Sequence, residues 1–167
     1  MYKHILVAVD GSDTSNLALQ EAIKLAKEQQ AELHLIHVVD ETPAYMMVET
    51  PYPVADLQKA MREAGQKVLA ICAATAREAG IEADTKFAVL EVLTQRICDV
   101  INEEAKRWPA DLIVIGTHGR RGFNHLILGS VAEGVIRFAT KPVLVIRGDF
   151  AEGKPYERFR PASRPVA

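Results

Sequence analysis

The sequence of 167 residues contains only two cysteines, Cys72 and Cys98, and no C-x-x-C pair. Without such a pair, neither a zinc site nor thioredoxin-like chemistry has support in the sequence. Both cysteines lie among apolar neighbours, in stretches that are typical of helices. We therefore expect them to be buried thiols of a protein that works in a reducing compartment.

Long apolar runs, a signal-peptide pattern and an excess of positive charge are missing as well. No run approaches the roughly 20 apolar residues that a membrane helix needs. The first apolar segment leads into Asp10-Gly11-Ser12-Asp13 rather than into the small residues of a cleavage site. The formal net charge is −2, which argues against nucleic-acid and membrane-surface partners. We expect a cytoplasmic protein.

Short β-branched runs alternate with longer amphipathic segments along the first 147 residues. The runs, which we interpret as strands, are residues 5–9, 33–39, 83–89, 112–115 and 143–146. The first, fourth and fifth are almost entirely apolar, as in strands of a parallel sheet that is covered on both faces. The alternation predicts an α/β fold, a doubly wound five-stranded parallel sheet of order 3-2-1-4-5 with helices on both faces.

Four helices are expected between these strands, over residues 13–30, 53–79, 91–106 and 130–140. Ser12 can cap the first helix, and Gly80 follows the second in the usual stop position. Ser130 and Glu133 fit a capping box for the fourth. Spacings of three and four predict the inward-facing residues of the two middle helices. These are Leu57, Met61, Ala64, Val68, Ile71 and Thr75, and then Leu93, Ile97, Val100, Ile101 and Ala105.

The strand order places a topological switch between the first and fourth strands, and ligands of such sheets bind at the carboxyl ends of the strands beside the switch. Gly116 and Gly119 follow the fourth strand, and Gly129-Ser130 opens the last helix. Glycines allow the backbone to approach an anion closely, and a helix N-terminus attracts phosphate. The same residues also fit a tight turn in which Ser130 is only a helix cap. The segment is neither of the two commoner phosphate-binding loops, because the lysine of G-x-x-x-x-G-K-[ST] and the glycine spacing of G-x-G-x-x-G are both missing.

The segment Gly116-x2-Gly119-x9-Gly129-Ser130 resembles the ATP-binding motif of the universal stress protein family, G-x2-G-x9-G-[ST]. The first strand with its loop (residues 5–12) and the segments 35–38 and 141–146 resemble the same family. The resemblance covers residues 1–147. It implies an adenine nucleotide alpha hydrolase-like nucleotide-binding domain of the ATP-binding subgroup. Residues 148–167 lie outside the resemblance; they contain glycines and prolines without helix or strand periodicity, so we expect a loosely ordered tail.

The resemblance also implies which residues form the site. Asp10 matches the acidic residue that contacts the nucleotide, although an aspartate before a glycine is equally a turn former. Val38 and Ile115 match residues on the two sides of the adenine. The complete implied set is Ala8, Val9, Asp10, Val38, Ile115, Gly116, Gly119, Gly129, Ser130 and Val131. The implied ligand is ATP, with ADP or AMP as alternatives and with Mg²⁺ or Mn²⁺ carried by the phosphates.

His118 and His125 also lie in this glycine-rich segment. Two histidines seven positions apart, with no acidic residue at ligand spacing, do not define a metal site. We interpret them as solvent-facing or phosphate-neighbouring residues, and we expect no metal site built from protein ligands.

No nucleophile-and-base pair stands out, and a G-x-S-x-G elbow is missing. We therefore expect no catalytic residues and favour a nucleotide-regulated stress-response protein that acts through binding and association. A slow ATPase and a dimeric adaptor without nucleotide function remain as alternatives. The apolar run 143–146 should form a sheet edge, which must be covered or paired. We favour a homodimer that pairs these strands across a two-fold axis, with shielding by the tail as the alternative.

Overall fold

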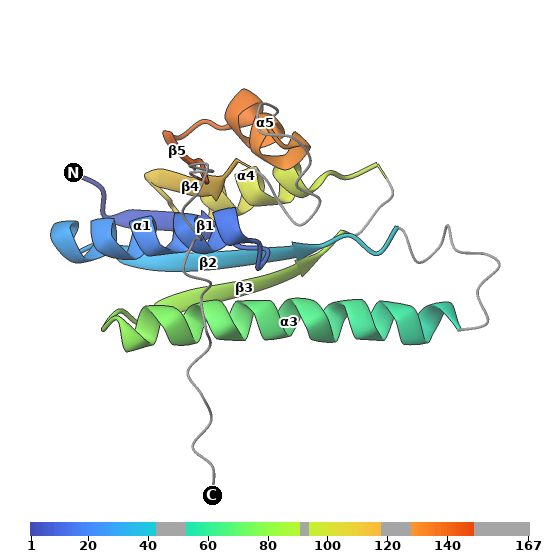
Figure 1. Cartoon of the computed structure of the whole chain (residues 1–167). Helices are drawn as coiled ribbons and strands as arrows, with labels where there is room; N and C mark the ends of the chain where they lie inside the picture. The colour runs from blue at the N-terminus through green and yellow to red at the C-terminus, as the bar shows by residue number, and fades with distance from the viewer. Residues whose placement is uncertain (43–52, 91–93, 118–127, 149–167) are drawn as a thin grey trace, which may run out of the picture.

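The computed structural model describes residues 1–42, 53–90, 94–117 and 128–148. Within these ranges, strands and helices alternate along the chain (Figure 1). In chain order they are β1 (His4–Ala8), α1 (Asp13–Gln29), β2 (Glu32–Val39), α3 (Val54–Glu78), β3 (Ala83–Val89), α4 (Ile97–Arg107), β4 (Leu112–Gly116), α5 (Ser130–Phe138) and β5 (Val143–Ile146). Part of the expected tail, residues 149–167, lies outside the described residues.

The strands form one parallel sheet of order β3-β2-β1-β4-β5, as the sequence predicted. β1 pairs with β2 on one side, where Leu6 lies opposite His34. On its other side it pairs with β4, where Val7 lies opposite Val114. The chain reverses its direction of travel across the sheet between β1 and β4, so the predicted topological switch is present.

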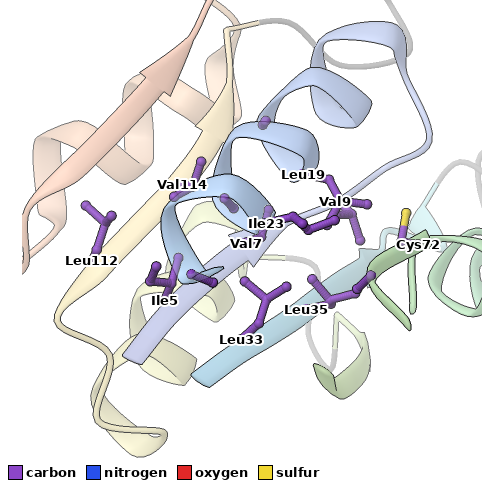
Figure 2. Close-up of a cluster of buried hydrophobic side chains, with 14 of the residues drawn as sticks. Ile5, Val7, Val9, Leu19, Ile23, Leu33, Leu35, Cys72, Leu112 and Val114 are labelled. Atoms are coloured by element: carbon purple, nitrogen blue, oxygen red, sulfur yellow. The ribbon is translucent and has the colours of Figure 1, made fainter. Parts of the chain in front are cut away.

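Two hydrophobic cores cover the two faces of the sheet. Alternate residues of β1, β2 and β4, among them Ile5, Leu33 and Val114, pack with α1 and α3 (Figure 2). The residues between them, such as Leu6, pack with α4 and α5 on the opposite face. β1 and β4 are buried along almost their whole length because helices cover both faces. Cys72 lies in the first core and Cys98 in the second, and both are free thiols, as expected.

The ends of α1 and α3 follow the predicted signals. Ser12 is the N-cap of α1, and its side chain accepts a hydrogen bond from the Ser15 amide. Gly80 follows α3 with a φ of +82°, a conformation that L residues rarely adopt.

The buried stripe of α3 differs from the predicted one. The side that packs on the sheet consists of Gly65, Leu69, Cys72 and Ala76, whereas Ala64 and Ile71 are exposed. The prediction followed the larger aliphatic residues, which lie one position to the side. The true stripe contains a glycine and an alanine because the helix approaches β2 so closely that a Cβ atom on Gly65 would lie 2.9 Å from the His37 ring.

The predicted start of α4 and the predicted cap of α5 also need correction. α4 begins at Ile97 rather than at residue 91, and the Asp99 carboxylate accepts from the backbone amide of the N-cap residue Arg96 at 3.2 Å. Ile101 and Ala105 are buried as predicted, whereas Leu93 lies outside the described residues. α5 begins at Ser130, but its N-cap is Gly129, which has no side chain to offer.

The capping box expected from Ser130 and Glu133 therefore does not form. Glu133 instead accepts a hydrogen bond from Arg137 at 2.7 Å, one turn further along the same helix. None of the described helices is both long and apolar enough to cross a membrane.

Candidate functional site

The candidate site lies where β1, β2 and β4 end at the same edge of the sheet. Because Val7 pairs with Val114, the Val9-Asp10 segment that follows β1 lies beside Ile115-Gly116 at the end of β4. Gly129 lies beside them, because its amide donates to the Thr117 carbonyl at 2.8 Å. This bond brings the start of α5 to the end of β4.

Four of the predicted residues lie on one face of the sheet and belong to the same apolar cluster. Ile115 is buried in the core beneath α4 and α5, and three partly buried side chains pack against that core: Ala8, Val38 and Val131. They come from β1, β2 and α5. The strand ends thus carry a partly exposed apolar surface of the kind that receives a flat aromatic ring.

Val9 differs from the other predicted residues because its side chain is buried in the opposite core, with α1 and α3. Its amide donates to the Ile36 carbonyl at 2.9 Å, and its carbonyl accepts from Nδ1 of His37 at 2.6 Å. Both backbone groups of Val9 are therefore bound to β2. Any contribution of this residue to the site comes through the path of its main chain.

Asp10 turns the chain from β1 into α1. Its Oδ1 accepts the Ser12 amide at 2.9 Å, and its own amide donates to Oγ of Ser15 at 3.0 Å. Gly11 follows with a φ of +81°. The turn-forming role that the sequence allowed for Asp10 is therefore present, and the same bonds hold its half-buried carboxylate at the edge of the candidate site.

Gly116 has a packing role that the sequence did not reveal. A Cβ atom at this position would lie 2.8 Å from the Thr14 carbonyl carbon and 3.0 Å from the Ser15 amide nitrogen. The first turn of α1 thus rests directly on the end of β4. Gly119, like His118 and His125, lies outside the described residues.

The first turn of α5 presents backbone donors to the site. The first hydrogen bond of the helix runs from the Glu133 amide to the Gly129 carbonyl, so the amides of Ser130 and Val131 precede the helical ladder. The Ser130 side chain is exposed at this end of the helix. Amides that precede the helical ladder, a hydroxyl group and the positive end of the helix dipole form an arrangement that attracts an anion.

Sequence reasoning did not single out the polar residues that support this edge. His37 is buried at 1% exposure, and its ring stacks on Phe87 at a centroid distance of 6.2 Å. The Glu41 carboxylate, also buried, accepts from Arg62 and Gln58 of α3, with 3.0 Å between Oε2 and Nη2 of Arg62. A polar residue within an apolar run was the available signal for His37.

A second polar cluster lies at the opposite, amino-terminal edge of the sheet. Nε2 of His34 lies 3.1 Å from a carboxylate oxygen of Glu104, and the His34 ring stacks on Trp108 at 4.8 Å. His4 meets the same indole edge-on at 5.5 Å. Burial lowers the pKa of His34, with Glu104 opposing the shift, so the imidazole is neutral near pH 7.

The two buried thiols and the acidic groups supply no metal centre or reactive cysteine in the described part of the chain. Burial, and secondarily the charge of Asp10, raise the pKa of Cys72 to about 11. Burial likewise raises the pKa of Cys98. Among the described residues no three His, Cys, Asp or Glu side chains are grouped closely enough to hold a metal ion.

The fold and the groups at the strand ends define a doubly wound α/β protein with a candidate ligand site at its topological switch. The model of the universal stress protein family matches residues 1–147. The chain therefore belongs to the universal stress protein family.

Individual relatives agree with this assignment. A universal stress protein of Methanocaldococcus jannaschii is 38% identical over 148 residues, which cover 88% of this chain and 83% of the relative. A family member from Burkholderia pseudomallei has a solved structure that is 35% identical, with a TM-score of 0.68, covering 87% of this chain and 96% of the other.

A third relative was solved with a nucleotide. The universal stress protein of Archaeoglobus fulgidus in complex with dAMP is 27% identical to this chain, with a TM-score of 0.61, covering 87% of this chain and 98% of that one.

Proposed function

We propose that this protein binds ATP at the carboxyl edge of β1, β2 and β4 and acts as a nucleotide-regulated stress-response protein through binding and association. The observation that carries the proposal is the apolar cluster of Ala8, Val38, Ile115 and Val131, which lies on one sheet face next to Asp10 and the N-terminus of α5. An adenine ring needs such an apolar surface, and the phosphates need donors beside it. The dAMP complex of the Archaeoglobus relative supports the same ligand class.

Each part of the proposed ligand has a matching group in the chain. The ring would lie against the apolar cluster, and the Asp10 carboxylate would accept from the ribose or neighbour a phosphate-bound Mg²⁺ or Mn²⁺. Gly116, Gly129 and Ser130, together with Gly119 outside the described residues, would line the phosphates. The nucleotide-binding domain would comprise residues 1–147 and the tail residues 148–167.

Calorimetry on the purified chain tests this proposal. ATP, ADP and AMP are titrated separately, and any nucleotide that the denatured protein releases is identified by chromatography. Ser130→Ala should weaken ATP binding by about tenfold to a hundredfold, because a hydrogen bond to a charged group contributes about 1.5–3 kcal/mol. Thr140→Ala removes another exposed hydroxyl group, just beyond the other end of α5, and should leave binding unchanged.

Two outcomes of that experiment decide against the proposal. One is the absence of both released nucleotide and measurable binding at millimolar ATP. The other is an equal effect of the Ser130 and Thr140 substitutions. Phosphate release above a control without protein, lost in Asp10→Ala, would instead favour the slow ATPase.

We further propose a homodimer that pairs the β5 edges (residues 143–146) of two copies. In the described part of the chain β5 pairs with β4 alone, and Leu144 is 37% exposed on this edge. Ile136 and Phe138 of the preceding helix are also exposed. Light scattering should give twice the chain mass of 18.4 kDa, and Leu144→Lys should shift the protein toward monomer. A wild-type protein that stays monomeric at micromolar concentration contradicts this proposal.

A cytoplasmic location is the last part of the proposal. Cys72 and Cys98 are free and lie in different cores, on opposite faces of the sheet, so they cannot form a disulfide with each other in this fold. Buried free thiols of this kind are typical of proteins in reducing compartments. Fractionation of the cells that produce the protein checks this location, and recovery outside the cytoplasmic fraction contradicts it.

A further inference from the structure

The peptide group between Val9 and Asp10 is held at both of its ends by side chains. The Val9 carbonyl accepts from Nδ1 of His37 at 2.6 Å, and the Asp10 amide donates to Oγ of Ser15 at 3.0 Å. Because a peptide group is planar, fixing its oxygen and its nitrogen fixes the orientation of the whole plane. The direction in which the chain continues into Asp10 is therefore set by His37 and Ser15.

His37 is itself held firmly in place. Its side chain is 1% exposed, stacks on Phe87 of β3, and lies against Gly65 of α3, where a Cβ atom would be 2.9 Å from both Cδ2 and Nε2. Because a carbonyl oxygen only accepts, Nδ1 of His37 carries the hydrogen of this bond. β3 and α3 thus determine where the donor points.

The need for such a donor follows from the end of β1. The strand ends at Ala8, whereas Val9 is still buried at 3% exposure. The Val9 amide is satisfied by the Ile36 carbonyl, but the Val9 carbonyl needs a donor of its own, because a buried carbonyl without a partner is costly. A histidine on the neighbouring strand satisfies this carbonyl, at the cost of placing a polar ring in the core.

We propose that His37 is a positioning residue of the nucleotide site: together with Ser15 it clamps the Val9–Asp10 peptide and so aims the Asp10 carboxylate at the bound nucleotide. This inference rests on the nucleotide binding proposed above. It assigns His37 no contact with the ligand and no part in proton transfer.

The test is a set of ATP affinities measured by calorimetry with Mg²⁺ present. His37→Leu removes the donor and should weaken binding about threefold to tenfold, the equivalent of one net hydrogen bond. His37→Asn keeps a donor near the position of Nδ1 and should recover most of the affinity. His34→Leu is the matched control, because His34 lies on the same strand and is also buried, but faces α4.

A double-mutant cycle separates positioning from general loss of stability. In the Asp10→Asn background, His37→Leu should change the ATP affinity less than about twofold, because the carboxylate that it aims is already gone. An undiminished loss in that background overturns the proposal, and so do equal losses from His37→Leu and His34→Leu. If His37→Leu does not fold, Ser15→Ala releases the other end of the same peptide and must show the same coupling to Asp10.

Hydrogen exchange of the ligand-free protein distinguishes this inference from the proposed function. The Asp10 amide should exchange faster in His37→Leu than in wild type, and His34→Leu should leave it unchanged. If wild type binds no adenine nucleotide, the proposed function and the role of His37 in it both fail, whatever the exchange rates. If wild type binds ATP but exchange at Asp10 is unaltered by His37→Leu, only the positioning role fails.

Discussion

Replacing Gly116 with alanine should destabilise the protein by about 1–2 kcal/mol, even without any ligand. The added Cβ would lie 2.8 Å from the Thr14 carbonyl carbon and 3.0 Å from the Ser15 amide nitrogen. These are backbone atoms in the first turn of α1, so no side-chain rotation can relieve the contact. The helix start would have to move by several tenths of an ångström away from β4.

Two opposing effects determine the size of this change. Overpacking a well-packed site costs about 1–3 kcal/mol. Alanine also restricts the unfolded chain, which returns about 0.4–1 kcal/mol, because Gly116 does not have a positive φ that would penalise it. The net loss corresponds to a fall in Tm of about 2–8 °C for a chain of this length.

Thermal and urea unfolding of the ligand-free protein measure the effect, and Gly80 is the control. Gly80 has a φ of +82°, and a Cβ atom added there would meet no other atom within 4 Å. The loss of stability on replacing Gly80 should therefore depend on how readily the new residue adopts a positive φ, so that Asn is less harmful than Ala. At Gly116 the loss should follow size, with Asn more harmful than Ala. The packing role of Gly116 would be refuted if Gly116→Ala were as stable as wild type. It would also be refuted if the Asn and Ala variants ranked in the same order of stability at both positions.

Three further predictions concern buried groups. The stability of the folded protein should fall as the pH drops below about 6.5, because burial lowers the pKa of His34 and protonation then favours the unfolded chain. The difference between the urea midpoints at pH 7.5 and pH 5 should be smaller in His34→Gln than in wild type. Gly134→Ala should destabilise by about 1–3 kcal/mol, because its Cβ would lie 2.5 Å from Sγ of Cys98. The loss should be smaller in a Cys98→Ala background, and additive urea midpoints would contradict this coupling. Cys72, with its pKa raised to about 11, should react with a thiol reagent at pH 8 only as fast as the protein opens, and rapid labelling of the native protein would show otherwise.

The sheet could be predicted from the sequence because its strands are short, apolar and separated by amphipathic segments. β3 and β5 have the predicted bounds, and the strand order follows from the alternation and from the handedness of the crossovers. The carboxyl edge of β1, β2 and β4 could therefore be singled out from the sequence as the place of a candidate site.

Helix faces and helix caps were harder to predict than the strands. The stripe of α3 includes Gly65, which looks like a weak helix residue until the His37 ring is seen against it. The N-cap position of α4, which usually carries a short polar residue, is occupied by Arg96, and the Asp99 side chain binds the Arg96 amide. At α5, Ser130 is of a type that often caps helices, but it is the first residue of the helix, and Gly129 is the N-cap.

The support of the candidate site was the least predictable part. Nothing local in the sequence indicates that His37 reaches the Val9 carbonyl, 28 residues away, or that Gly116 receives the first turn of α1. Both contacts arise only after the parallel pairing has brought β1, β2 and β4 side by side.

Trp108 is the only tryptophan of the chain, and its position between His4 and His34 gives the protein a built-in spectroscopic probe. Its indole stacks on one imidazole and meets the other edge-on, at the sheet edge opposite the candidate site. Because a protonated imidazole quenches a neighbouring indole, the intrinsic fluorescence should follow the protonation of His34, whose ring stacks on the indole, and the opening of the fold. Titration with a nucleotide at the far edge should leave that emission almost unchanged, so that one optical signal reports stability independently of ligand occupancy.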